Sequence, residues 1–178
     1  MNLNYKLTNT DFIQYQMFST SKSKLDNKKR FRSRILFPII LTGLAIYMLV
    51  NNENTILAVV YLSLSLLWFF LYPTYSKWRV KKYFERHVAE NYANRIGTDV
   101  KIEFKENLIS MSGLTSQSEI NKTELKELIE TEIHFFLKMA TGLSLIIPKR
   151  AIKNQFEFKA KVTDLGAEYV NEINWQWK

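Results

Sequence analysis

Two long stretches of the chain carry no charged residue, and a short polar segment separates them. The first runs from Ile35 to Asn52 and the second from Asn54 to Ser76, 18 and 23 residues respectively. At about 1.5 Å per residue, helices of these lengths measure roughly 27 and 35 Å, close to the ~30 Å hydrocarbon core of a bilayer. The pattern predicts a membrane-spanning helical hairpin within residues 31–76, with spans at about 35–51 and 55–75 and a turn between them.

Positive charge gathers at the two ends of this hairpin. Between Lys22 and Lys82 there are 11 Lys and Arg residues against two acids, net +9, whereas the remaining residues carry 14 basic and 15 acidic groups, net −1. The overall charge of +8 is therefore not spread over the folded remainder, which argues against nucleic acid as a partner. Because basic loops stay cytoplasmic, we expect both termini in the cytosol and the turn outside. The residues expected at the membrane surface are Lys28, Lys29, Arg30, Arg32, Arg34, Lys77, Trp78, Arg79, Lys81 and Lys82.

A buried hairpin in a soluble protein and a signal peptide are the alternatives to a membrane hairpin. A buried helix pair of this length rarely lacks charge on every face. A signal peptide does not fit either, because the first apolar run follows a 34-residue polar region and a second span comes at once. No ionisable residue interrupts either span, so a channel or carrier is not expected.

Shorter elements flank the hairpin on both sides. Residues 1–30 contain an alternating segment at Leu3–Leu7, typical of a strand, and then helical spacings with Thr10 as candidate N-cap. These two elements have no core of their own, so we expect them to dock on the cytosolic module. After the second span, residues 77–98 have an amphipathic helical pattern that Gly97 ends.

From residue 99 onward the apolar period changes to two, which is typical of strands. Short strands are predicted at residues 100–104, 108–112 and 116–120. The longest alternation follows, from Ile129 to Met139, and after a turn the chain returns through Leu143 to Pro148.

The long alternation places Glu130, Glu132 and His134 together on its solvent face. Residues 154–173 then predict a C-terminal amphipathic helix that covers the apolar side of the sheet. The expected class is α+β, with a transmembrane hairpin and a domain at 99–178 in which a small antiparallel sheet is closed by this helix.

Candidate chemistry is sparse. The chain has no cysteine and two histidines, and it lacks nucleotide-binding, nucleophile-elbow and zinc-protease motifs, so we expect no enzyme activity, no cofactor and no metal. Glu130 and Glu132 have strand spacing suited to an acid and base pair, but alternating charge on a wet strand is ordinary, and no catalytic residue is assigned.

Two adjacent bases and two tryptophans remain as candidate contacts. Lys149 and Arg150 are either a solvated turn or a contact for anionic phosphates or a partner. Trp175 and Trp177 are either partner or membrane anchors or packing under the last helix.

The order of these elements resembles that of the YcxB-like family of bacterial membrane proteins. The resemblance covers nearly the whole chain: an opening "YKLTNTDF", the hairpin with basic flanks, and "VKIEFKENLISMSG", "SQSEIN" and "LIETEIHFFLKMATGLSLIIPKRAI". The piece "IIPKRA", Ile146 to Ala151, is the most specific. The resemblance implies a pleckstrin-homology-like module tethered to a bacterial inner membrane, with no established chemistry.

Together these observations favour a non-enzymatic inner-membrane protein whose cytosolic module contacts a protein partner or anionic lipid. The alternative is an immunity protein against a membrane-acting or secreted toxin, which it would meet through the spans or the acidic strand face of Glu127, Glu130 and Glu132. Small residues in the spans permit a homo-oligomer without requiring one.

Overall fold

The computed structural model describes residues 1–113 and 117–177, which form two compact units. The first, here called the α+β domain, comprises Met1–Gln16 and Glu85–Gln176. The second, here called the hairpin unit, comprises Met17–Phe84 with Trp177. The expected α+β class is confirmed. Each unit is described by itself.

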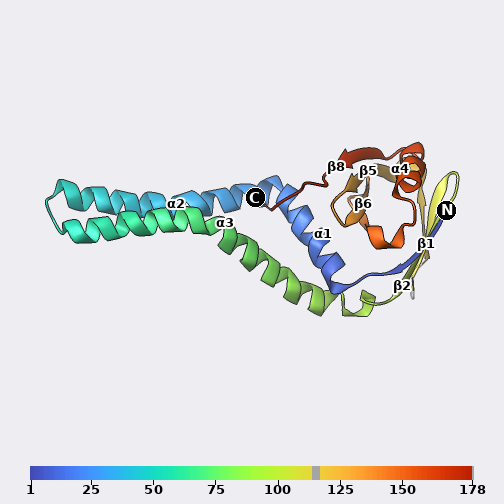
Figure 1. Ribbon diagram of the computed structural model, residues 1–178, viewed down its shortest axis with the longest axis horizontal. Coiled ribbons are helices and arrows are strands. Elements are labelled where there is room, and N and C mark those ends of the chain that lie inside the picture. The colour runs from blue at the N-terminus through green and yellow to red at the C-terminus, as the bar shows by residue number, and fades with distance from the viewer. Residues whose placement is uncertain (114–116, 178) are drawn as a thin grey trace. The chain divides into compact units, whose positions relative to one another are not determined.

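Two antiparallel helices, α2 (Lys24–Val50) and α3 (Thr55–Asn91), make up most of the hairpin unit (Figure 1). Both are long and apolar enough to cross a membrane. The helices extend beyond the predicted spans, because the basic segment before Ile35 is already part of α2 and α3 continues to Asn91. Their basic flanks are therefore helical and hold their side chains at fixed spacings.

The turn between α2 and α3 is built by asparagines, as the polar segment predicts. Asn52 has a φ of 51°, a left-handed conformation that asparagine tolerates better than most residues. The Asn54 side chain accepts a hydrogen bond from the backbone N–H of Leu57 at 3.0 Å and so caps the start of α3. Four residues thus reverse the chain between two long helices.

Small and hydroxylated residues hold α2 against α3. Ala45 and Ala58 are completely buried, which allows the backbones to approach closely. Ser65 Oγ lies 3.2 Å from the carbonyl oxygen of Pro38, to which it donates, and 3.1 Å from Thr42 Oγ1. These contacts pair the middle of α2 with the first third of α3.

One antiparallel sheet of the α+β domain joins the start of the chain to its second half. Its order is β1-β2-β3-β4, with bounds Asn2–Lys6, Asp99–Phe104, Leu108–Ser112 and Gln117–Asn121. Leu3 lies opposite Ile102, and both are buried. The predicted strands agree with these bounds to within one residue. Ser116, which the prediction includes, lies outside the described residues. The N-terminal strand is thus paired with the first strand after the hairpin.

The second sheet has the order β7-β6-β5-β8. The bounds of its strands in sequence order are Leu125–Glu130, His134–Met139, Ser144–Pro148 and Glu168–Asn171. β5 and β8 are parallel, and the other pairs are antiparallel. Gly142, with a φ of 86°, lies in the turn between β6 and β7, where a left-handed residue is required.

The helix α4, Gln155–Asp164, joins the cores of the two sheets (Figure 1). The ring of Phe158 is fully buried and lies 5.7 Å from the ring of Phe104 on β2 and 5.0 Å from that of Phe135 on β6. At the other side of the domain, the ring of Phe12 on α1 (Asn9–Lys22) lies 4.9 Å from that of Tyr92. Aromatic contacts therefore close the domain at both ends.

Four predicted element boundaries are wrong. The helix predicted for residues 77–98 ends at Asn91, before Gly97, and a short 3₁₀ turn at Ala93–Arg95 follows it. The alternation from Ile129 to Met139 is not one strand, because a turn at Thr131 separates β5 from β6, with Thr131 N donating to His134 O at 2.8 Å. The C-terminal helix ends at Asp164 instead of continuing to residue 173, because Gly166 takes a φ of 106° and the chain enters β8. The first helix begins at Asn9 and not after Thr10.

Candidate functional site

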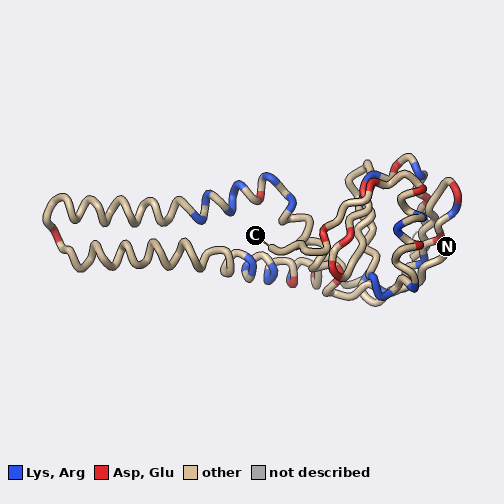
Figure 2. The backbone as a smooth tube through the Cα atoms, turned by 45° about the horizontal axis from the view of Figure 1, so that its top comes forward, with Lys and Arg blue, Asp and Glu red and all other residues tan. Residues whose placement is uncertain are grey.

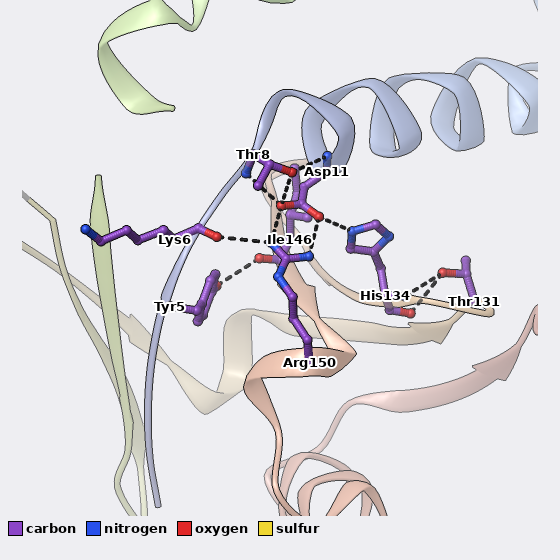
Figure 3. A network of polar contacts seen from close by, with 8 residues as sticks. All are labelled: Tyr5, Lys6, Thr8, Asp11, Thr131, His134, Ile146 and Arg150. Atoms are coloured by element: carbon purple, nitrogen blue, oxygen red, sulfur yellow. Dashed lines mark hydrogen bonds and ion pairs between the residues drawn. The ribbon is translucent and has the colours of Figure 1, made fainter. Parts of the chain in front are cut away.

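The carboxylate of Asp11 lies at the centre of a buried polar cluster (Figure 3). Asp11 is in the first turn of α1, where Thr8 N and Thr8 Oγ1 donate to its Oδ2 at 2.7 and 2.9 Å. In return, the backbone N–H of Asp11 reaches Thr8 Oγ1 at 3.4 Å. This reciprocal arrangement is a capping box with Asp at the third helical position, and it fixes both the helix start and the carboxylate.

Two side chains from distant parts of the chain, those of His134 and Arg150, donate hydrogen bonds to the same carboxylate. His134 Nε2 lies 2.7 Å from Asp11 Oδ1, while Arg150 Nη1 and Nη2 donate to the two oxygens at 2.9 and 2.6 Å. Figure 3 shows both side chains pointing at Asp11 from different elements. The guanidinium contact is bidentate, the geometry in which arginine binds carboxylates best.

Electrostatics in this cluster favour the ionised carboxylate. Burial by itself raises the pKa of Asp11, which is 2% exposed, but hydrogen bonds from Arg150, His134 and Thr8 outweigh it and hold the pKa well below its ordinary value. The hydrogen bond to Asp11 raises the pKa of Arg150 in turn. Because an ionised carboxylate only accepts, Nε2 of His134 carries the hydrogen.

The same neighbourhood ties the N-terminal strand to the second sheet. Arg150 Nη2 donates to the carbonyl oxygen of Lys6 at 3.1 Å, and the Tyr5 hydroxyl donates to that of Ile146 at 2.8 Å. Tyr5 is buried, and this desolvation raises the pKa of its phenol. Residues near the N-terminus are thus bonded to β7 and to the 3₁₀ turn Lys149–Ala151.

The pairing of Asp11 with His134 resembles part of a hydrolytic triad, but its setting is closed. His134 is 1% exposed, and its ring stacks on that of Phe136 at 5.6 Å with an interplanar angle of 15°. The Asp11 carboxylate accepts hydrogen bonds from Thr8, His134 and Arg150. The arrangement therefore joins three segments of the chain: the start of α1, the start of β6 and the 3₁₀ turn after β7.

A second buried carboxylate, Glu130 at the end of β5, is equally well satisfied. Lys149 Nζ donates to Oε1 at 2.7 Å, and Lys159 Nζ and the Tyr169 hydroxyl donate to Oε2 at 3.1 and 2.6 Å. Burial by itself raises the pKa of Glu130, but these hydrogen bonds lower it to about 2. The hydrogen bond that the Tyr169 hydroxyl donates to Glu130, together with burial, raises the pKa of Tyr169 to about 12.

The predicted solvent face of the long strand is therefore wrong for two of its three polar residues. Glu130 and His134 are 3% and 1% exposed, whereas Glu132 lies in the turn between β5 and β6 and is exposed. Lys149 and Arg150 are not simply a solvated turn, because each binds a different buried carboxylate. Sequence reasoning missed Asp11 altogether, although "TNTD" carries the capping-box spacing that marks it.

The basic residues predicted at the membrane surface flank the apolar parts of α2 and α3 (Figure 2). Arg30 and Arg34 are half-buried and face α3, where Arg34 Nε donates to the carbonyl oxygen of Phe69 at 3.2 Å. The others are exposed: Lys28, Lys29, Arg32, Lys77, Trp78, Arg79, Lys81 and Lys82. The flanks thus contain bases with exposed side chains and two arginines, Arg30 and Arg34, whose side chains are half-buried in the hairpin.

The two C-terminal tryptophans are both half-buried. The guanidinium of Arg30 lies 4.5 Å from the centroid of the Trp177 ring, a cation–π contact within the hairpin unit. The backbone N–H of Trp175 donates to the carbonyl oxygen of Glu172 at 2.9 Å, in a turn that follows β8.

Among residues 1–113 and 117–177, no group of three or more His, Asp and Glu side chains is placed to hold a metal ion.

Comparisons with protein-family models, with curated proteins and with solved structures gave no match.

Proposed function

We propose that this protein is a non-enzymatic binding or regulatory protein anchored in a bacterial inner membrane, with its α+β domain in the cytosol. The observation that carries the proposal is the pair of long helices, each with a charge-free apolar stretch that is exposed and a basic segment beside it. Only 6% of the most apolar 18-residue stretch of α2 is buried, and 17% of that of α3. Core helices of soluble proteins bury such stretches, whereas a bilayer stabilises them without protein contacts.

The polar clusters of the α+β domain support binding over catalysis. Both buried carboxylates, Asp11 and Glu130, are occupied by internal donors. An active site needs a group that is poised but reachable, and neither carboxylate is reachable. Their role in this proposal is to make the domain a rigid platform at the membrane surface.

The first sheet offers a surface for a protein partner. One face carries the cross-strand row Asn2, Glu103, Ser110 and Glu119, a polar series running across all four strands. This face is hollowed, with a volume of about 500 Å³ lined by these residues and their neighbours. A concave polar face with both Lys101 and Glu103 suits a peptide segment that carries charges of both signs.

The experiment that tests this function is affinity purification of the tagged full chain from gently solubilised native membranes, followed by mass spectrometry. Ser110→Arg fills the hollow, and Thr163→Arg adds the same side chain at an exposed position of α4. We expect one stoichiometric partner that Thr163→Arg retains and Ser110→Arg loses. A partner that both variants retain, or release of the chain from membranes by alkaline carbonate, contradicts the proposal.

The identity of the partner separates a regulator from an immunity protein. The immunity alternative relied on an acidic strand face, and the burial of Glu130 removes one of its three carboxylates. Recovery of a secreted or membrane-acting toxin favours immunity, and recovery of a resident membrane or cytosolic protein favours regulation.

A further inference from the structure

A pocket opens between α2 and α3 at the basic end of the hairpin unit. It has a volume of about 310 Å³ and is lined by Asn27, Arg30, Phe31, Arg34, Tyr72, Pro73 and Ser76. Arg30 and Arg34 are one helical turn apart on α2 and therefore share a face. No acidic residue lines the pocket, and the carboxylate that interacts with Arg30, that of Asp26 one turn earlier on α2, leaves two arginines with a net positive charge.

The pocket lies where the apolar part of each helix ends. Ile35 begins the charge-free run of α2 directly after Arg34, and Ser76 closes that of α3 directly before Lys77. In the membrane placement proposed above, this level corresponds to the boundary between hydrocarbon and lipid headgroups. Arginines at that depth meet lipid phosphates.

Two side chains on α3 line the pocket with hydroxyls that have no internal partner. Tyr72 and Ser76 are 7% and 5% exposed as whole residues, and neither hydroxyl makes a hydrogen bond with any residue in the described part of the chain. Neither hydroxyl oxygen is fully buried, so each can donate to a ligand in the pocket. Tyr72 lines the pocket from α3, and Arg30 lines it from α2.

Further donors around Arg30 and Arg34 are unused. Arg34 donates through Nε to Phe69 and stacks on its ring at 4.3 Å, which leaves its terminal nitrogens available. Arg30 donates one hydrogen bond, to Asn27 Oδ1. The Trp177 ring stacks on Arg30, and its Nε1 is a buried donor with no acceptor among the described residues. Donors therefore greatly outnumber acceptors here, which is the composition of an anion site.

We infer that this pocket binds the phosphate of an anionic phospholipid, with Arg30 and Arg34 as its charged donors and Tyr72 and Ser76 as its neutral donors. The apolar walls of Phe31 and Pro73 and the lipid-facing surfaces of α2 and α3 accommodate the beginning of the acyl chains. This inference rests on the proposed membrane placement and specifies how the hairpin is held at one depth.

The test is native mass spectrometry of the detergent-solubilised full chain with added phosphatidylglycerol, with phosphatidylcholine as the zwitterionic comparison. We expect wild-type protein to retain one phosphatidylglycerol and to prefer it clearly over phosphatidylcholine. Arg30→Gln with Arg34→Gln should reduce retention by roughly tenfold or more, as expected for two lost charges next to a phosphate. The control, Lys28→Gln with Arg32→Gln, also removes two positive charges one helical turn apart, but from exposed positions outside the pocket. It should reduce lipid retention by no more than about threefold, because these two charges attract anionic lipid without binding one headgroup.

A second pair of variants leaves every charge in place and removes one hydroxyl each. Because these changes are small, a loss of lipid binding is not confused with misfolding. Tyr72→Phe removes only the pocket hydroxyl, while Tyr75→Phe removes a hydroxyl outside the pocket. We expect about threefold weaker retention for Tyr72→Phe, as for one lost hydrogen bond, and no change for Tyr75→Phe.

Each of three results overturns the inference. The two charge-pair variants lose lipid equally, the protein retains the two lipids equally, or excess inorganic phosphate displaces the lipid fully, which indicates a site for a soluble anion.

Failure of the proposed function gives other results. In that case every variant is released by alkaline carbonate or captures no partner, whereas failure of the pocket leaves both membrane insertion and partner capture intact.

Discussion

His134 Nε2 and Asp11 Oδ1 lie 2.7 Å apart although 123 residues and the whole helical hairpin separate them in the chain. Both side chains are almost completely buried. Arg150 closes the same cluster from the 3₁₀ turn after β7, so one carboxylate joins the N-terminal helix to two segments of the second sheet. The N-terminal segment therefore belongs to the α+β domain in two ways: β1 pairs with β2, and the contacts of Asp11 stabilise the domain.

The first prediction concerns this carboxylate. Asp11→Asn removes the charge that Arg150 faces and turns an amide N–H toward another donor, so we expect the free energy of unfolding to fall by roughly 3 kcal/mol. The value lies at the low end for a broken buried pair because the Arg150 side chain is half-exposed and can turn to water. Urea titration of the full chain in mild detergent, followed by near-ultraviolet circular dichroism, measures it.

Asp99→Asn is the matched control for that titration. Asp99 pairs with Lys6 at 3.7 Å, but both side chains are more than half exposed, so its loss should cost less than about 0.5 kcal/mol. Equal effects of the two substitutions would show that the cluster around Asp11 contributes no more than a surface ion pair.

The hairpin and several strands could be predicted from sequence because they depend on local patterns. Charge-free runs about as long as the hydrocarbon core of a bilayer is thick have few alternative structures, and "VNNENT" interrupts them with residues that suit a turn. The β6–β7 hairpin was similarly clear, since "MATGL" places Gly142 between two apolar segments.

The polar clusters could not be predicted because they depend on partners far away in the chain. A period of two through Thr131 ignores the turn between β5 and β6, and it wrongly places Glu130 and His134 on a solvent-exposed face. Their actual partners, Asp11, Lys159 and Tyr169, lie on α1, α4 and β8, and no local pattern connects them.

A second prediction compares Glu130 with Glu132. Glu130→Gln replaces a carboxylate that accepts from two ammonium groups and a phenol, and we expect a loss of roughly 2–3 kcal/mol in the free energy of unfolding. Glu132→Gln, in an exposed turn, should change it by less than about 0.5 kcal/mol. The same urea titration tests both, and indistinguishable values would contradict the buried ion-pair geometry.

The third prediction is a loss of stability in acid. Hydrogen bonds outweigh burial and lower the pKa of Glu130 from 4.5 to about 2, and Asp11 is shifted in the same direction. A carboxyl with a lowered folded pKa stabilises the protein fully above its unfolded pKa and progressively less as the pH falls. Stability should therefore fall from about pH 4.5 toward pH 2, and Glu130→Gln should flatten part of this slope.

The raised pKa of Tyr169 also predicts that the protein loses stability at alkaline pH. The folded pKa of Tyr169 is raised from 10.0 to about 12, so the stabilisation is complete below pH 10 and is lost as the pH rises toward 12. Tyr169→Phe should remove this alkaline slope and leave most of the acid slope unchanged. A variant that changes both slopes equally would show that the two groups do not titrate as assigned.

A fourth prediction uses the absence of cysteine to test the pairing of α2 with α3. Thr42 Oγ1 and Ser65 Oγ lie 3.1 Å apart, so Thr42→Cys with Ser65→Cys should form an intramolecular disulfide on mild oxidation. Ser63→Cys with Thr42→Cys is the control, because the Ser63 hydroxyl bonds to Val59 within α3. The measurement is alkylation of the cysteines with and without prior reduction: a disulfide blocks alkylation until it is reduced. Equal crosslinking of the two pairs would contradict the contact between Thr42 and Ser65.

The last prediction concerns topology, which follows from the distribution of charge. The turn carries one acid and no base, whereas the flanks of both spans are strongly basic, so the turn should face outward. Asn52→Cys should therefore react with a membrane-impermeant maleimide in intact cells, whereas Glu106→Cys, in the exposed turn between β2 and β3, should react only after the membrane is opened. The reverse pattern would put the α+β domain outside the membrane, where the arginine pocket faces the outer leaflet. Labelling of both positions in intact cells would mean that α2 and α3 do not span the membrane at all.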